Sequence, residues 1–95
     1  METNEARVNV TYAGANGDLV DPVFFDAADG DVRQWVAEAI RGGNIPGIAA
    51  DPSVDLADFV LDRFSATDHR PYNTIFIRPK TPFGKHGQLA MVVKV

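Results

Sequence analysis

The sequence contains no cysteine and no long hydrophobic run. Without cysteine, its 95 residues cannot form a disulfide, a thiolate metal site or a cysteine nucleophile. No segment approaches the roughly 18 consecutive apolar residues that cross a membrane. The start, Met1 to Glu5, lacks the basic and then apolar pattern of a signal peptide. We therefore expect one small cytoplasmic domain with no membrane contact.

Acidic residues are absent from the last part of the sequence. All thirteen lie at or before Asp68, together with only four basic residues, so this part carries a charge of −9. The part after Asp68 carries +5, from Arg70, Arg78, Lys80, Lys85 and Lys94. Opposite charges in one small domain either complement each other on folding or meet a partner. The net charge of −4 argues against nucleic acid as that partner.

Residues that support catalysis or metal binding are few and scattered. The two histidines, His69 and His86, do not share a metal-ligand spacing. The two serines lie outside any nucleophile motif. Asp26, Asp29 and Asp31 cluster but lack the continuation of a calcium loop, and helix capping explains them. We expect no metal, no cofactor and no enzymatic activity.

The first part of the chain is predicted to form a β-hairpin. Residues 1–6 are expected to be a flexible start, and the period-two alternation from Arg7 to Tyr12 predicts a half-buried strand. Turn residues follow over 13–18, with Asn16-Gly17 as the strongest turn signal. A second strand is predicted at about 19–25, where Pro22 indicates a sheet edge or a bulge.

The segment from Asp29 to Arg41 is predicted to be an amphipathic helix. Asp26 and Asp29 are candidate caps for its start, and Gly42-Gly43 offers a left-handed residue to end it. Apolar residues recur at the spacing of one buried helical face. They are Val32, Trp35, Val36, Ala39 and Ile40. Trp35 is therefore expected to anchor the core.

The second half is predicted to contain further strands. Asp51 and Pro52 could begin a second helix over 53–64, but the apolar run Phe59-Val60-Leu61 favours a strand over about 58–64. Thr74 to Arg78 is predicted to be a strand. Leu89 to Val95, after an exposed loop, is predicted to be a last strand or a tail.

The order strand–strand–helix–strand–strand–strand predicts an α+β domain, with a mixed sheet of four to five strands packed on one main helix. The hairpin, the helix and the Asn44-Ile45-Pro46 exit from it together resemble the ubiquitin-like β-grasp family. The resemblance covers residues 7–80 of a single domain, 1–95, with 81–95 as loop and C-terminal segment. It implies a non-catalytic module that binds a protein partner.

The resemblance places the partner on the exposed face of the sheet. If Ile75 and Ile77 point to the helix, Phe76 and Arg78 point outward, and an exposed aromatic residue beside an arginine is typical of interface hot spots. Phe83 or the last segment could instead cover Phe76. The predicted partner-binding residues are Phe76, Arg78, Arg70, Lys80 and Lys85.

Two alternative functions follow from the end of the chain. Conjugated members of the family end in glycine, whereas this chain ends in Val95. A modifier precursor processed at Gly84 or Gly87 is one alternative. The other is a small structural or assembly protein that adds the 89–95 strand to a neighbour's sheet edge. For the binding module, a monomer is favoured.

Overall fold

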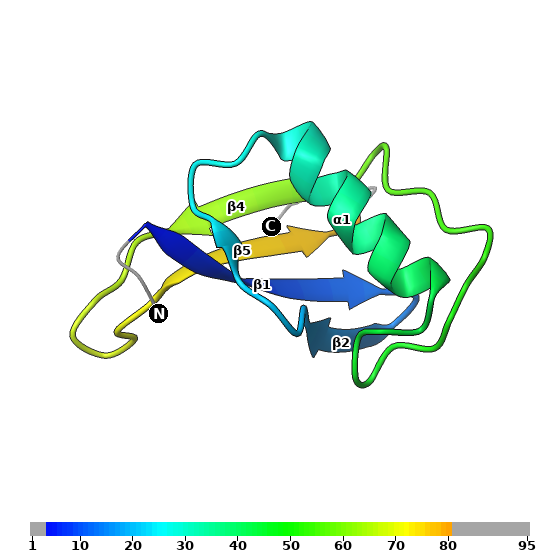
Figure 1. Ribbon diagram of the computed structural model, residues 1–95, viewed down its shortest axis with the longest axis horizontal. Helices are drawn as coiled ribbons and strands as arrows, with labels where there is room; N and C mark the ends of the chain where they lie inside the picture. The colour runs from blue at the N-terminus through cyan, green and yellow to red at the C-terminus, as the bar shows by residue number, and fades with distance from the viewer. Residues whose placement is uncertain (1–3, 81–95) are drawn as a thin grey trace, which may run out of the picture.

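The computed structural model describes residues 4–80, which form one helix and five strands. The elements are β1 (Glu5–Tyr12), β2 (Ala15–Asp18), β3 (Val23–Phe24), α1 (Asp29–Arg41), β4 (Val60–Phe64) and β5 (Asn73–Arg78). The helix lies across one face of a mixed sheet (Figure 1). This is the predicted α+β class in a β-grasp-like arrangement.

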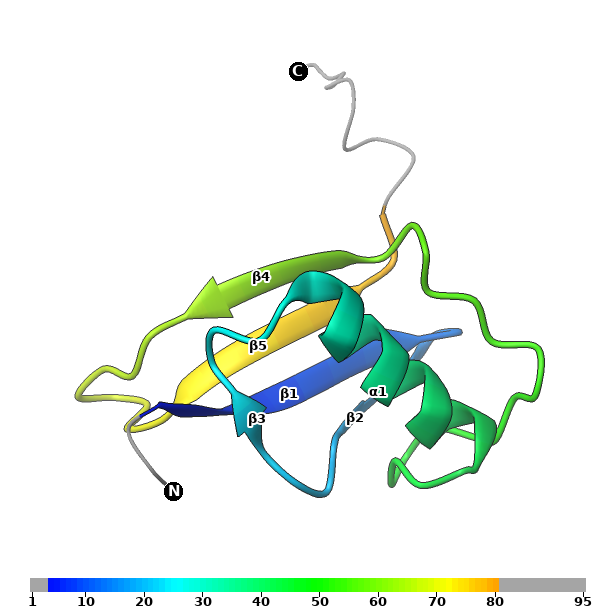
Figure 2. The same ribbon diagram turned by 45° about the horizontal axis from the view of Figure 1, so that its top comes forward.

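The sheet has the order β2-β1-β5-β4, and the short β3 pairs with the beginning of β1. The two central strands, β1 and β5, run parallel, and the other pairs are antiparallel. Figure 2 shows β5 between β1 and β4 with α1 in front of the sheet. The strands that meet at the centre therefore come from the two ends of the described chain.

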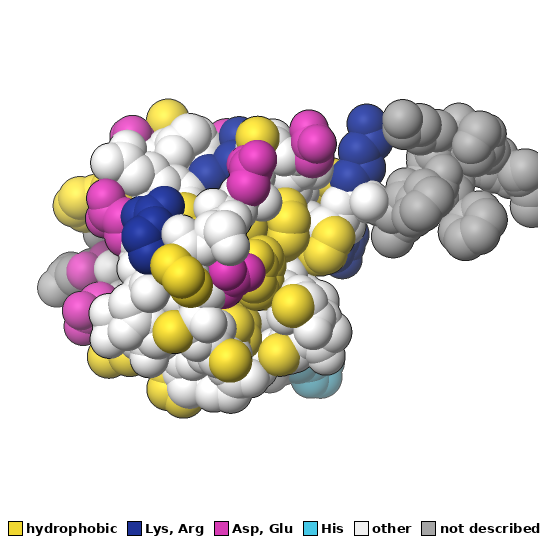
Figure 3. All heavy atoms as spheres, turned by 90° about the vertical axis from the view of Figure 1, so that its right-hand side faces the viewer, with side chains coloured by type: hydrophobic (Ala, Val, Ile, Leu, Met, Phe, Trp, Pro, Cys, Tyr) yellow, Lys and Arg dark blue, Asp and Glu magenta, His cyan; other side chains and the backbone are white. Residues whose placement is uncertain are grey.

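The core lies between α1 and the inner face of the sheet. Alternate residues of β1 and β5 point to the helix, as the period of two requires. The buried apolar residues are Ala6, Val8, Val10, Val32, Val36, Ile40, Ile45, Ile48, Val54, Leu56, Ile75 and Ile77. Four of them come from the connection between α1 and β4, which covers one end of the core. Figure 3 faces this end and shows hydrophobic side chains with acidic ones around them.

The turn of the first hairpin lies at the beginning of the predicted turn segment 13–18, three residues before the signal Asn16-Gly17. Ala13 and Gly14 have φ values of 53° and 80°, and a two-residue turn with both central φ values positive matches the twist of the flanking strands. Asn16 and Gly17 belong to β2 and pair with Thr11 and Val10. The predicted Asn16-Gly17 turn is therefore wrong.

The strand predicted at 19–25 is two short pairings with a break. The Leu19 N–H still donates to the Val8 carbonyl oxygen at 3.0 Å, directly after β2. The chain then leaves β1, and Pro22, which has no N–H to donate, lies in the break. Val23 returns to pair with Ala6. β1 itself begins at Glu5, two residues before the predicted start.

The helix has the predicted bounds but not the predicted cap. Its N-cap is Ala28, which makes no side-chain capping hydrogen bond, so the predicted capping by Asp26 or Asp29 is wrong. At the other end Gly43, with φ of 70°, provides the predicted left-handed residue. The prediction for Trp35 is also wrong, because 39% of its surface is exposed.

The later predictions agree with the structure where residues are described. β4 confirms a strand rather than a helix before Phe64, and β5 confirms the strand predicted from Thr74 to Arg78. Residues 53–59 form turns and irregular chain. The predicted 81–87 loop and the strand predicted from Leu89 to Val95 lie outside the described residues.

Candidate functional site

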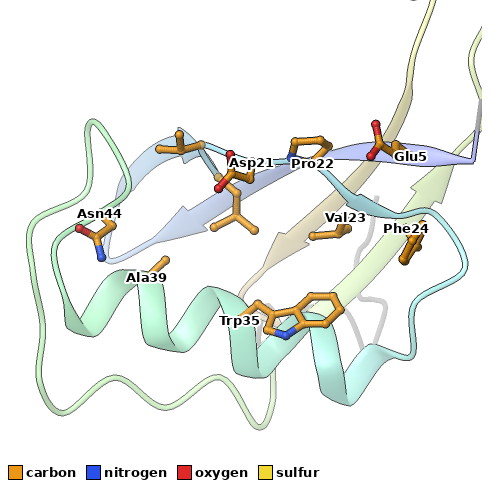
Figure 4. Close-up of a pocket in the computed structure, with 10 residues that line it drawn as sticks. Glu5, Asp21, Pro22, Val23, Phe24, Trp35, Ala39 and Asn44 are labelled. Carbon is orange, nitrogen blue, oxygen red and sulfur yellow. The ribbon is translucent and has the colours of Figure 1, made fainter. Parts of the chain in front are cut away.

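A groove runs between α1 and the segment that carries β3 (Figure 4). Its volume is about 430 Å³. Figure 4 shows Trp35, on the helix, opposite Val23, with Phe24 beside them and Ala39 and Asn44 at the other end. The lining residues are Glu5, Leu19, Val20, Asp21, Pro22, Val23, Phe24, Trp35, Ala39 and Asn44.

The groove gathers large hydrophobic side chains that water contacts. Among the described residues, five large hydrophobic side chains are exposed, and three of these line the groove. Val20 is 72% exposed, Phe24 58% and Trp35 39%. Single exposed hydrophobic residues need no explanation, but a group around one hollow is typical of a contact surface.

The helix presents two adjacent rows of apolar residues, and only one of them is buried. Val32, Val36 and Ile40 follow each other at intervals of four and have no exposed surface. Trp35 and Ala39 form the neighbouring row, which faces β3 and lines the groove. The apolar stripe is therefore wider than the core needs, and its excess forms one wall of the groove.

An open edge of the sheet forms the other wall. Within the described chain, β2 and β3 each pair only with β1. The chain after α1 approaches β2, since a β-carbon at Gly47 would lie 2.8 Å from the Asn16 carbonyl oxygen. The part of the edge that lines the groove is therefore the 19–24 segment with β3, where an additional strand can pair. The groove lies between this edge and α1, so a bound extended chain would contact both.

The rim of the groove is negatively charged. Glu5 and Asp21 line it, and no lysine or arginine does. A partner with basic residues beside its apolar ones would match this charge.

The strand face that the sequence predicts as the partner surface lies on the opposite side of the sheet. Ile75 and Ile77 are buried toward the helix, as expected. Arg78 is exposed, but its guanidinium forms an ion pair with Asp62 of β4. Phe76 is half-buried and packs edge-to-face on Phe64, with ring centres 5.6 Å apart.

The other predicted partner-binding residues are only partly brought together. Arg70 and Phe76 line one small hollow on this open face of the sheet. Lys80 is exposed at the end of the described chain, away from that hollow. Lys85, Gly84 and Gly87 lie outside the described residues, as does Phe83.

Among residues 4–80, the two titratable groups with shifted pKa values form a pair between β1 and the connection after α1. The Tyr12 hydroxyl donates to Asp51 Oδ2 at 2.5 Å. This hydrogen bond raises the pKa of Tyr12 and lowers the pKa of Asp51. Ser53 donates its backbone N–H and its hydroxyl to Asp51 Oδ1, and both bonds lower the Asp51 pKa further. The pair fastens the connection to β1.

Residues 4–80 contain neither a candidate metal-binding cluster nor a candidate membrane-spanning helix. No three histidine, cysteine, aspartate or glutamate side chains of this part are placed to hold a metal ion. None of its helices is long and apolar enough to cross a membrane.

Comparison with known proteins found no matching family model, curated protein or solved structure. The sequence interpretation missed the groove because it assigned Trp35 to the core and residues 19–25 to one continuous strand. The available signal was Pro22 between the hydrophobic residues Val20 and Phe24.

Proposed function

We propose that this protein is a non-catalytic protein-interaction module, and that its partner inserts apolar side chains into the groove between α1 and β3. The observation that carries the proposal is the grouping of exposed Val20, Phe24 and Trp35 around one hollow of about 430 Å³. As the sequence suggests, we also propose that the protein is not an enzyme, that it is cytoplasmic and that it is related to the ubiquitin-like family.

The partner segment is proposed to be an extended chain. Its backbone would pair with the open edge at β3, as in β-strand addition. Its apolar side chains would contact Trp35 and Phe24, and basic residues beside them would meet Glu5 and Asp21. Buried aromatic anchors of this kind commonly dominate the binding energy of an interface.

Selection from a random peptide library tests the proposal because the library samples many possible partner segments at once. The protein should enrich sequences that combine hydrophobic anchors with lysine or arginine. Trp35→Ala should weaken the binding of these peptides by at least about thirtyfold, because truncation of a hot-spot aromatic residue costs about 2 kcal/mol or more.

Two exposed phenylalanines supply a matched control. Phe24, 58% exposed, lines the groove, whereas Phe64, 48% exposed, lies on β4 at the far edge of the sheet. Phe24→Ser should reduce peptide binding and Phe64→Ser should not. Loss of peptide binding in Phe64→Ser alone would place the binding surface on the sheet face around Phe76. Failure to enrich any peptide would contradict the proposal.

A further inference from the structure

The open face of the sheet, opposite the helix, carries a second and smaller hollow. Its volume is about 200 Å³, below the 300–1,000 Å³ usual for pockets that hold a drug-sized ligand. Arg7, Arg70, Tyr72 and Thr74 contribute to it from β1, β5 and the chain just before β5. It therefore has room for one chemical group rather than for a large molecule.

Two arginines of the hollow are held by aromatic rings. The Arg7 guanidinium lies 3.9 Å from the ring centre of Tyr72, and that of Arg70 lies 5.8 Å from the ring centre of Phe64. Neither arginine forms an ion pair with any residue of the 4–80 segment. Stacking on a ring orients a guanidinium without occupying its N–H groups. Arg70 Nη2 donates to the Ser65 carbonyl oxygen at 3.2 Å, so an anion would be bound by the other N–H groups of Arg70 and by those of Arg7.

Two buried polar atoms beside the hollow have no hydrogen-bond partner in the described chain. They are Arg70 Nε and Thr74 Oγ1. Thr74 is only 4% exposed, although its position on β5 places it on the open face. Buried polar groups are nearly always paired, and an unpaired one is unfavourable. An acceptor that entered the hollow and displaced the side chains covering these two atoms would relieve this cost.

We propose that this hollow binds a phosphate group through Arg7, Arg70 and the Thr74 hydroxyl. The planar guanidinium fork matches the oxygen geometry of phosphate, and a phosphate supplies several acceptor oxygens for the unpaired donors. The group belongs either to inorganic phosphate or to a phosphorylated side chain. The inference does not depend on the groove, which lies on the other side of the sheet.

One carboxylate limits the position of the anion. Asp18 also lines the hollow, and its Oδ1 accepts a hydrogen bond of 2.7 Å from the Asn9 side chain. Asn9 pairs with Asp18 across the strands and lies two residues along β1 from Arg7. Two residues of a strand span roughly 7 Å. The anion is therefore expected at the arginine end, with Asp18 weakening its binding.

Titration of the isotope-labelled protein with sodium phosphate, followed by two-dimensional NMR, tests this site. Sodium chloride of equal ionic strength is the reference. Saturable shifts are expected at Tyr72 and Thr74. Arg7→Gln and Arg70→Gln should each weaken binding by at least about tenfold, since a hydrogen bond to a charged group contributes about 1.5–3 kcal/mol. Asp18→Asn should strengthen it, by up to about fivefold for an exposed charge.

Two further measurements identify the source of the phosphate group and test whether diffuse electrostatic attraction explains the binding. A phosphoserine peptide that binds more tightly than inorganic phosphate would identify a phosphorylated side chain as the source, and equal affinity would identify the free anion. Arg41→Gln, at the end of α1, should leave both affinities unchanged. The proposal is overturned if phosphate gives no saturable shift beyond chloride, if both hollow arginines prove dispensable, or if Arg41→Gln is equally harmful.

Discussion

Tyr12 is a residue whose hydroxyl and ring have separate structural roles. The hydroxyl donates to Asp51, which lies in the connection after α1. The ring packs against Phe59 further along the same connection, with ring centres 5.9 Å apart. Tyr12 therefore holds two points of a long irregular segment against the end of β1.

We predict that Tyr12→Phe lowers the melting temperature most at neutral pH. The hydrogen bond lowers the Asp51 pKa from its ordinary 3.8. The bond therefore stabilises the folded protein above pH 3.8, and this stabilisation is lost as the pH falls through the lowered pKa that Asp51 has in the folded state. The same bond raises the Tyr12 pKa from 10.0, so the stabilisation disappears again as the pH rises through that raised value. The difference between the two proteins should narrow at both extremes in thermal unfolding followed by circular dichroism.

The second tyrosine provides the control for this pH profile. The Tyr72 hydroxyl makes no hydrogen bond within the part of the chain that the structure describes, although its ring contacts Arg7. Tyr72→Phe should therefore leave the melting temperature nearly unchanged at every pH. A Tyr12→Phe difference that stays constant from acid to alkaline pH would show that ring packing, and not the Asp51 bond, causes it.

At the scale of elements, β2 depends on a glycine that packs against another segment. A β-carbon at Gly17 would lie 2.3 Å from the Pro46 carbonyl oxygen and 2.9 Å from Ile45 Cγ2. The first of these is a backbone atom and cannot rotate away. The absence of a side chain at Gly17 therefore lets the chain after α1 approach β2 closely.

We predict that Gly17→Ala destabilises the protein by about 1–3 kcal/mol, the usual cost of forcing extra atoms into a packed site. Gly30→Ala is the matched control, because a β-carbon there meets nothing within 4 Å and Gly30 lies within α1. That change should stabilise the protein by about 0.4–1 kcal/mol through the unfolded chain. Chemical denaturation measures both, and equal effects of the two variants would refute the packing argument.

The elements that the sequence predicted well are those whose signals are local. The spacing of apolar residues identified α1 with its correct ends, and alternation identified β1 and β5. The turn was misplaced because Asn16-Gly17 has turn propensity but is used for contacts between segments. The Asn16 side chain donates to Thr11 Oγ1 and Asn9 Oδ1 across the hairpin, and Gly17 faces Pro46.

The start of the helix shows why local capping rules failed. Arg63, on β4, donates its Nε to the Phe25 carbonyl oxygen at 3.1 Å and its Nη2 to that of Ala27. Its Nη1 forms an ion pair of 2.5 Å with Asp29. The segment that enters α1 is thus held by a residue 34 positions after Asp29. No pattern near the helix could reveal this partner.

At the scale of the whole molecule, the candidate site depends on how distant elements meet. The predicted partner surface lies on β5 because the resemblance to the ubiquitin-like family implies a partner on that face of the sheet. The groove joins the edge near β3 to a helix row that includes Trp35, so it exists only once α1 has crossed the sheet. The spacing of hydrophobic residues placed Trp35 on the apolar face of the helix. It could not distinguish the buried row of that face from the exposed row beside it.

The two central strands of the sheet, β1 and β5, come from opposite ends of the described chain and pair with each other. Parallel pairing places Val8 beside Ile75 and Val10 beside Ile77, and none of these four side chains has exposed surface. Burial of such a side chain contributes about 1.5–3 kcal/mol, whereas a whole domain is stable by only about 5–15 kcal/mol. The first strand therefore has no adequate core until β5 is in place.

We predict that a chain ending after Phe59 has no cooperative unfolding transition, whereas a chain ending after Lys80 unfolds cooperatively. The shorter chain retains β1, β2, β3 and α1 but leaves Val8 and Val10 without Ile75 and Ile77. The longer chain retains every strand pair of the described sheet. Thermal and denaturant scans by circular dichroism distinguish the two. A cooperative transition in the shorter chain would show that the hairpin and helix form a sufficient core, and its absence in the longer chain would show that residues 81–95 are required for folding.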